Sequence, residues 1–159
     1  MKFENSVMIS RPVDIIFDFV TNFENNPQWQ TDILELEITS EGGIKLGSTY
    51  RCVNRFMVQR IETVGVIVNY EPDRACSFRI ESGSLTGKIN YWFEADHGGT
   101  KFTTTADLDL RYFRFGNLIV IRKINKQLKN DMLRLKKLLE NGDRRLQVAT
   151  GFVSDSAVI

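Results

Sequence analysis

Between residues 33 and 110, apolar and polar side chains alternate along the chain. In the first stretch, Leu34, Leu36 and Ile38 alternate with glutamate and threonine, and five further stretches repeat this pattern. Turn signals separate the stretches, the strongest being Asp96-His97-Gly98-Gly99. A period of two residues is typical of strands with one buried face. The pattern therefore predicts six strands that form an antiparallel meander.

The residues before this region predict three further elements. Phe3, Val7 and Ile9, separated by polar residues, indicate a first strand. A helix is expected to begin near Pro12, because proline is favoured in the first helical turn. A second short helix is expected to end before Pro27, because the residue that precedes a proline is disfavoured in the α conformation.

From about Gly116 to Asn141 the apolar period becomes helical. One stripe of this segment is apolar and the remainder is charged or polar; the stripe contains Ile121, Ile124, Leu128, Met132, Leu135 and Leu139. A helix of this length would extend about 39 Å. Gly142 is typical of the position just after a helix C-terminus. The residues from Asp143 onward alternate only weakly, so we expect an extended or irregular tail.

Together these elements predict an α+β fold with one domain, residues 1–142, and a C-terminal tail, residues 143–159. The long helix is expected to cover the apolar face of a curved antiparallel sheet of six to seven strands. A concave sheet and a straight helix do not bring their apolar faces into contact along their whole length. We therefore expect a cavity for an apolar small molecule between them.

The composition adds limits on partners and compartment. The chain has 21 Lys and Arg against 20 Asp and Glu, a net charge of +1, so no nucleic-acid partner is expected. The first residues are polar and contain no apolar targeting core. The longest wholly apolar run, Leu118–Ile121, is far too short to span a bilayer. We expect a cytoplasmic protein in which Cys52 and Cys76 are reduced thiols.

Five short motifs in this order resemble those of one known superfamily. They are Arg11–Val20, Asn26-Pro27-Gln28-Trp29, Leu46–Tyr50, Tyr70-Glu71-Pro72 and Gly98–Phe102. Their order resembles that of the START-like, or SRPBCC, superfamily, and their residues resemble its polyketide cyclase/dehydrase-like branch. The resemblance spans about residues 3 to 141. It implies a helix-grip fold, in which the sheet wraps around the C-terminal helix and two short helices follow the first strand.

The resemblance implies several functions. The superfamily includes lipid carriers, polyketide aromatase/cyclases, hormone receptors and co-chaperones, and the fold alone does not choose among them. We favour binding or transport of a hydrophobic or aromatic small molecule or lipid in the internal cavity. One alternative is a polyketide cyclase/dehydratase-like enzyme that uses acid–base assistance in the same cavity. Another is a co-chaperone-type module that binds a partner through the outer face of the sheet.

The alternation along each strand also predicts which side chains face the cavity. The candidates share the parity of the apolar face of their strand, or the apolar stripe of the helix: Tyr50, Cys52, Asn54, Phe56, Phe78, Tyr91, Phe93, Thr104, Leu128 and Met132. The alternative is that these side chains fill a solid core.

Arg60 and Glu62 form a second candidate group with an ambiguous orientation. They share the parity of Val64, Val66 and Val68, so an inward ion pair is one interpretation. However, Ile61, Thr63 and Ile67 make an equally good apolar face on the opposite side. A bulge near Gly65 would reverse the assignment.

Two further residues, Trp29 and Asn125, are candidates on the rim of the cavity, and the role of Asn54 on its wall has alternatives. Asn54 is polar among apolar neighbours, so its amide needs a hydrogen-bond partner, which is a ligand, a water or the backbone. Trp29 is expected at the rim, where it either contacts a ligand or packs the first helix against the sheet. Asn125 lies at the edge of the helical stripe and is expected near the cavity mouth.

No catalytic residue can be assigned from the sequence, and no metal or cofactor is expected. His97 is the only histidine and lies in a turn, where we expect it to be exposed. The two cysteines and one histidine do not make a zinc site, and no nucleotide-binding glycine pattern is present. The segment Arg111–Lys123 mixes basic, aromatic and aliphatic residues. We favour a helix start that packs on the sheet over contact with a membrane surface.

Overall fold

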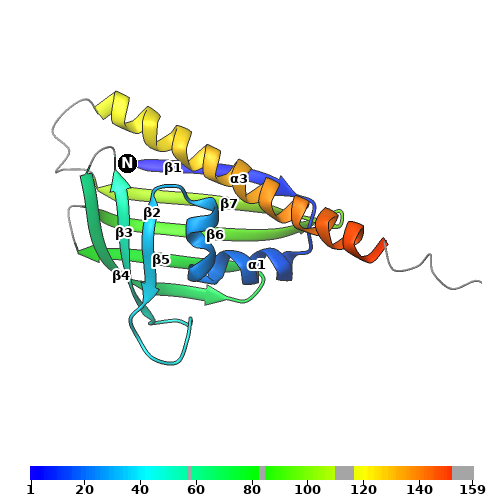
Figure 1. Ribbon diagram of the computed structural model, residues 1–159. Coiled ribbons are helices and arrows are strands. Elements are labelled where there is room, and N and C mark those ends of the chain that lie inside the picture. Colours follow the sequence, from blue (N-terminus) through cyan, green and yellow to red (C-terminus); the bar gives the residue numbers. More distant parts are fainter. Residues whose placement is uncertain (57–58, 83–84, 110–116, 152–159) are drawn as a thin grey trace, which may run out of the picture.

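The seven strands form one antiparallel sheet, as the alternation predicts (Figure 1). In this computed structural model the backbone is described for residues 1–56, 59–82, 85–109 and 117–151, and side chains for these residues except 56, 82, 117 and 143–151. The strands are β1 (Lys2–Ile9), β2 (Ile33–Ile38), β3 (Thr49–Phe56), β4 (Gln59–Glu71), β5 (Ala75–Ser82), β6 (Thr86–Asp96) and β7 (Gly99–Asp109). The helices are α1 (Val13–Thr21), a 3-10 turn (Phe23–Asn25), α2 (Asn26–Trp29) and α3 (Asn117–Gly151).

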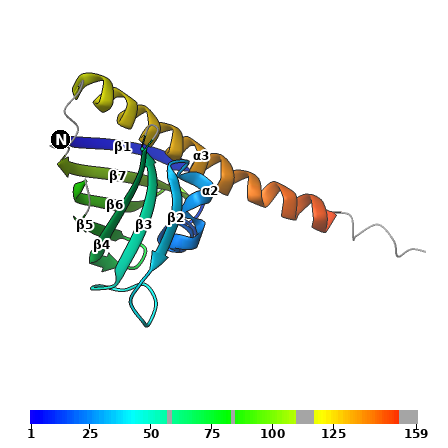
Figure 2. The ribbon, with the colours of Figure 1, turned by 60° about the vertical axis from the view of Figure 1, so that its left-hand side comes forward.

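The strand order is β1-β7-β6-β5-β4-β3-β2, so that β1 closes one edge and β2 the other. The sheet curves, and β2, β3 and β4 bend toward the viewer in Figure 2. Helix α3 runs along β1, and α1 and α2 lie on the same side of the sheet as α3. None of the described helices is long and apolar enough to cross a membrane.

The short helices differ in one respect from the sequence prediction. A 3-10 turn begins after Asn22, whose side-chain oxygen accepts a hydrogen bond from the backbone N–H of Glu24 at 3.2 Å. The 3-10 turn ends at Asn25, so the prediction that a short helix ends before Pro27 is confirmed. The reason given for it is wrong, because Asn26 has α-helical backbone angles and begins α2, which has this proline in its first turn. A proline is tolerated there, since the first N–H groups of a helix have no partner within the helix.

Helix α3 is longer than predicted. The expectation that it stops at Gly142 and that an irregular tail follows is wrong for residues 143–151, because α3 continues to Gly151. A glycine inside a helix costs only about 1 kcal/mol relative to alanine. The neighbours Glu140, Arg144 and Arg145 are good helix formers and offset this cost. Residues 152–159 of the predicted tail lie outside the described residues.

One end of the concave face, next to the β6–β7 hairpin, is filled by aromatic and aliphatic side chains. The ring of Phe93 lies 5.1 Å from that of Phe17 and 5.1 Å from that of Phe102, and Trp29 lies 6.2 Å from Phe102. Leu135 of α3 is fully buried in the same cluster. We call this region, defined by these five residues, the packed end.

Candidate functional site

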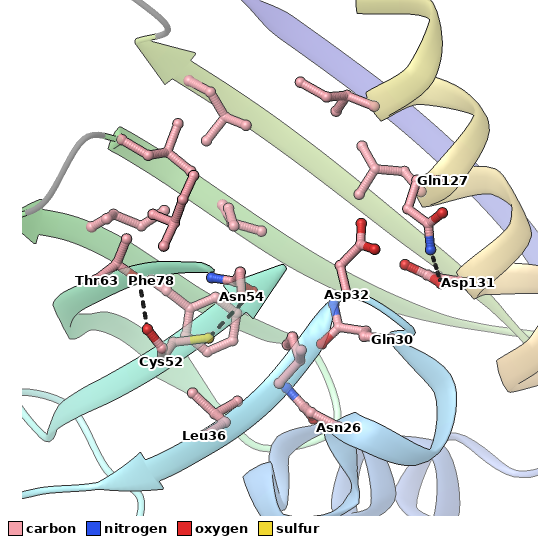
Figure 3. Close-up of a pocket in the computed structure, with 18 of the residues that line it drawn as sticks. Asn26, Gln30, Asp32, Leu36, Cys52, Asn54, Thr63, Phe78, Gln127 and Asp131 are labelled. Carbon is pink, nitrogen blue, oxygen red and sulfur yellow. Dashed lines mark hydrogen bonds between the residues drawn. The ribbon is translucent and has the colours of Figure 1, made fainter. Parts of the chain in front are cut away.

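A cavity of about 370 Å³ occupies the opposite end of the concave face. It lies between the sheet and the first turns of α3, and residues from β2 to β7, from α2 and from the segment that joins α2 to β2 line it (Figure 3). This volume lies within the ~300–1,000 Å³ typical of small-molecule sites.

Most of the cavity wall is apolar. Five apolar side chains define the region that we call the cavity end: Ile61, Ile80, Leu108, Ile124 and Leu128. Three of them project from strands and two from α3. Burial of apolar ligand surface against such a wall is favourable by about 25 cal/mol per Å². The wall can therefore hold an apolar molecule without any charged contact.

Polar side chains gather where α3 passes the segment between α2 and β2 (Figure 3). Gln30 donates a hydrogen bond from Nε2 to the hydroxyl of Tyr91 at 3.2 Å. One carboxylate oxygen of Asp131 accepts from the backbone N–H of Thr31 at 3.3 Å and from Nε2 of Gln127 at 2.9 Å. We call these residues, together with two further ones, the polar cluster: Asn26, Gln30, Thr31, Asp32, Tyr91, Gln127 and Asp131.

Burial changes the protonation of the acids in the polar cluster. Burial raises the pKa of Asp131 to about 6, and hydrogen bonds from Thr31 and Gln127 oppose this rise. Burial also raises the pKa of Asp32, against the attraction of Arg55 and Lys123. Both carboxyl groups therefore bind protons more readily than exposed aspartates do.

Burial also keeps the tyrosine hydroxyls and the cysteine thiol of the cavity wall protonated, which makes them poor nucleophiles. It raises the pKa of Tyr50 and Tyr91 far above the usual range of a phenol, and it raises the pKa of Cys52 to about 11. The two phenols therefore keep their protons at neutral pH and can donate hydrogen bonds. The thiol of Cys52 is also protonated and is a poor nucleophile.

Among the residues that the structure describes, two side-chain oxygens of the polar cluster are buried without a hydrogen-bond partner. They are Oδ1 of Asn26 and Oε1 of Gln30, and both residues line the cavity. Asn26 as a whole is only 3% exposed. Burial of an unpaired polar group costs free energy, so such atoms are typical of positions that a water or a ligand completes.

Six of the residues expected at the cavity line it. They are Tyr50, Cys52, Asn54, Phe78, Tyr91 and Leu128. The amide oxygen of Asn54 accepts a hydrogen bond from the thiol of Cys52 at 3.5 Å, so a neighbouring side chain supplies the partner that this amide needed. Their role in ligand binding stays a prediction.

Four other candidates lie in the buried core and do not line the cavity: Trp29, Phe93, Thr104 and Met132. Trp29 packs against Tyr91 and Phe102, which agrees with the packing interpretation. Phe93, Thr104 and Met132 face the interior as predicted, but they are buried in the core beside the cavity.

The inward ion pair of Arg60 and Glu62 is wrong. Antiparallel pairing sets Thr63 opposite Cys52 and Ile61 opposite Asn54, and residues that face each other in this way share one face of the sheet. Arg60 and Glu62 therefore point to the outer face. There they bind other partners, Arg60 pairing with Glu35 at 2.5 Å and Glu62 with Arg51 at 2.7 Å.

The remaining candidates have other surroundings. Asn125 accepts a hydrogen bond from Asn5 of β1 at 3.1 Å on an exposed surface, and it does not line the cavity. Strand β3 ends at Phe56, whose side chain lies outside the described residues. The side chain of His97 is 99% exposed in the β6–β7 turn, as expected.

Sequence reasoning missed most of the polar cluster: Asn26, Gln30, Asp32, Gln127 and Asp131. One signal was present. Asp131 lies beside Met132 and one turn from Leu128 and Leu135, so it borders the apolar stripe of the helix. A carboxylate in that position points toward the sheet, and it could have been included as a candidate.

Close approach between β3 and β4 shapes the wall next to Tyr50. Gly65 of β4 pairs with Tyr50, and a Cβ atom at this glycine would lie 2.5 Å from the tyrosine hydroxyl. It would also lie 2.3 Å from the carbonyl oxygen of Arg79 on β5. The ring of Tyr50 therefore occupies space that any other residue at position 65 would take.

Solved structures share this architecture. An aromatase/cyclase, Zhui, from Streptomyces sp. R1128 has a TM-score of 0.72 at 14% identity, and the match covers 94% of this chain and 97% of that one. A START superfamily protein from Mycobacterium smegmatis has a TM-score of 0.68 at 15% identity, covering 91% and 98%. The Aha1 dimer from Colwellia psychrerythraea has a TM-score of 0.61 at 16% identity, covering 88% and 96%.

At such identities these structures establish the fold alone, which is the START-like helix-grip fold. No curated protein matches the sequence significantly. The model of one sequence family, described as "Polyketide cyclase / dehydrase and lipid transport", matches residues 1–140. The chain therefore belongs to the polyketide cyclase/dehydrase and lipid transport family.

Proposed function

We propose that this protein binds a hydrophobic or aromatic small molecule or lipid in the cavity and acts as its carrier. The observation that carries the proposal is a largely apolar cavity of about 370 Å³ between the sheet and α3. A ligand that buries about 300 Å² of apolar surface there gains roughly 7 kcal/mol before the costs of binding. A dissociation constant of 1 μM needs about 8 kcal/mol, so this apolar gain alone gives a weaker affinity, as suits a carrier that must release its ligand.

The test fills the cavity from α3. Leu128→Trp places a large ring in the cavity, whereas Leu133→Trp places the same ring on the exposed side of the helix. Binding of apolar ligands is measured by calorimetry, and native mass spectrometry detects a ligand that copurifies. We expect Leu128→Trp to weaken binding at least tenfold and Leu133→Trp to leave it unchanged. Equal binding by both variants, or no binding by the parent protein, contradicts the proposal.

One observation favours a second candidate, a cyclase/dehydratase-like enzyme in the same cavity. Asp131 has a pKa of about 6 and lies beside the cavity, and a group that titrates near neutral pH suits general acid–base catalysis. In an enzyme, Asp131→Asn lowers turnover on the order of 100-fold while substrate binding remains. In a carrier, no turnover is present to lose.

A further inference from the structure

The polar cluster has unused hydrogen-bond acceptors on its acidic side chains. Asp131 and Asp32 are both acids on the cavity wall, and each raises the energy of negative charge near the other. Asp131 is only 6% exposed, and its three hydrogen bonds all reach one oxygen, Oδ1. In the part of the chain that the structure describes, no hydrogen bond reaches its other oxygen.

The two amides beside these acids have unused capacity. Asn26 and Gln30 each have a buried side-chain oxygen that no described residue contacts with a hydrogen bond. If the Gln30 amide is turned over, its oxygen accepts from the Tyr91 hydroxyl and its nitrogen becomes free instead. Either orientation leaves one atom of Gln30 for a ligand. Ionised carboxylates accept hydrogen bonds and do not donate them, so Asp131 and Asp32 decide whether the head group of the ligand must be a donor or an acceptor.

The cations near the cavity do not neutralise Asp131. Lys123 and Arg55 line the cavity, but both are exposed at its edge. They act on Asp32 through space, and neither forms an ion pair with Asp32 or Asp131 within the described residues. Hence the buried part of the polar cluster is rich in acceptors, and an anionic group placed there meets uncompensated negative charge.

From this geometry we infer that the ligand is an apolar molecule with a hydrogen-bond donor head, a hydroxyl or a protonated amine, that binds at Asp131 and Gln30. The apolar body lies against the cavity end, and a carboxylate-headed ligand is rejected. The inference rests on the proposed function, since it names the class of ligand that the same cavity selects.

The test compares three ligands that share one ring system. They are 2-naphthalenemethanol, 2-naphthylmethylamine and 2-naphthoate, titrated by calorimetry at about pH 8, where the acid is ionised and most of the amine is protonated. We expect the alcohol or the amine to bind at least tenfold more tightly than the carboxylate. The alcohol and the amine distinguish a neutral from a charged donor.

Variants locate the selective group. Asp131→Asn keeps the size of the side chain, and we expect it to reduce the preference for the amine over 2-naphthoate about tenfold. Gln30→Leu removes the amide, and it should weaken the alcohol severalfold. The matched control Ile80→Ala alters the apolar wall, so it should weaken all three ligands equally and leave their ratios unchanged. Circular dichroism establishes that each variant folds.

Each outcome decides one of the two proposals. If 2-naphthoate binds as tightly as the alcohol and the amine, the inference about the head group is wrong while the carrier proposal stands. Loss of tight 2-naphthoate binding in Lys123→Gln would then place the head at the cation on the edge. If none of the ligands binds the parent protein, the carrier proposal fails and the inference fails with it. Donor preference that Asp131→Asn reduces and Ile80→Ala preserves supports the inference.

Discussion

At the packed end of the concave face, Phe17, Phe93 and Phe102 fill the space under α1, whereas at the cavity end Ile80 and Leu128 border an open volume. Both ends belong to one sheet, and α3 passes over both. The difference lies in the additional helices. Helix α1 contacts β6 and β7 near their hairpin and adds an aromatic layer there. The cavity end has mainly α3 and the shorter side chains of the strands.

This comparison shows how a fold separates stability from binding. Fully buried side chains with many neighbours stabilise the packed end, where protein interiors approach the density of crystals. The cavity end lacks part of this stabilisation, because its wall borders an open volume that is available to a ligand. Changes at the two ends should therefore have different consequences for unfolding and for binding.

The largest expected effect comes from truncating one leucine side chain of α3 at the packed end and comparing it with one at the cavity end. Leu135→Ala removes a fully buried side chain of the packed end, and we expect it to lower the free energy of unfolding by about 4 kcal/mol. Leu128→Ala truncates a half-buried side chain that already faces open space, so the expected loss is about 1 kcal/mol. Urea unfolding measures both values. Equal losses would show that the two ends are packed alike.

A smaller effect is expected from the acid at the cavity end. The folded pKa of Asp131, about 6, lies above its ordinary value of 3.8, so the fold favours the protonated form. The stability from this preference is complete below about pH 4 and is lost as the pH rises through about 6. Relative to Asp131→Asn, the parent protein should lose on the order of 1 kcal/mol between about pH 4 and pH 7.

Thermal or urea unfolding of both proteins across this range measures the difference. The other carboxyl groups are common to the two proteins and cancel in the comparison. A difference that stays constant with pH, or that favours the parent protein as the pH rises, would show that Asp131 is not buried as described.

The smallest effect is expected on the outer face of the sheet, which we expect to contribute neither to the stability of the packed end nor to binding at the cavity end. Arg60 pairs with Glu35 in an exposed position, where solvent screens the attraction. Arg60→Ala should leave the free energy of unfolding and the ligand affinity unchanged within the error of measurement. Calorimetric titration with the best ligand of the series provides the second measurement. A tenfold loss of affinity would reopen the inward orientation.

The order of elements and the inward face of most strands could be predicted from the sequence, because both depend on local periodicity. Which inward-facing residues of a strand line the cavity, and which pack in the core, could not be predicted. Tyr91 and Phe93 are two residues apart on β6 and face the same way, yet only Tyr91 lines the cavity. The side chains of α1 decide this difference, and no period in β6 reports where α1 packs.

Strand β4 and helix α3 show two other limits. Both faces of β4 have apolar residues, so its orientation depended on pairing with β3, which is a long-range property. In α3, Gln127 lies on the polar face and Asp131 borders the apolar stripe, and both were missed because a polar or charged residue on a helix is ordinarily assigned to solvent. Their position at the cavity follows from the path of the segment between α2 and β2, where Thr31 meets Asp131.

The absence of a side chain at Gly65 gives one position control over the size of the binding chamber. A Cβ atom at Gly65 would lie 2.5 Å from the Tyr50 hydroxyl and 2.3 Å from the carbonyl oxygen of Arg79, so even an alanine there must displace both the ring and the strand. A ring displaced toward the cavity would occupy part of its volume. Directed evolution of ligand size could therefore begin at position 50 with position 65 kept as glycine, because a Cβ atom at 65 would also lie 2.3 Å from the carbonyl oxygen of Arg79. The dimensions of this cavity thus depend on a glycine behind its wall as well as on the side chains that line it.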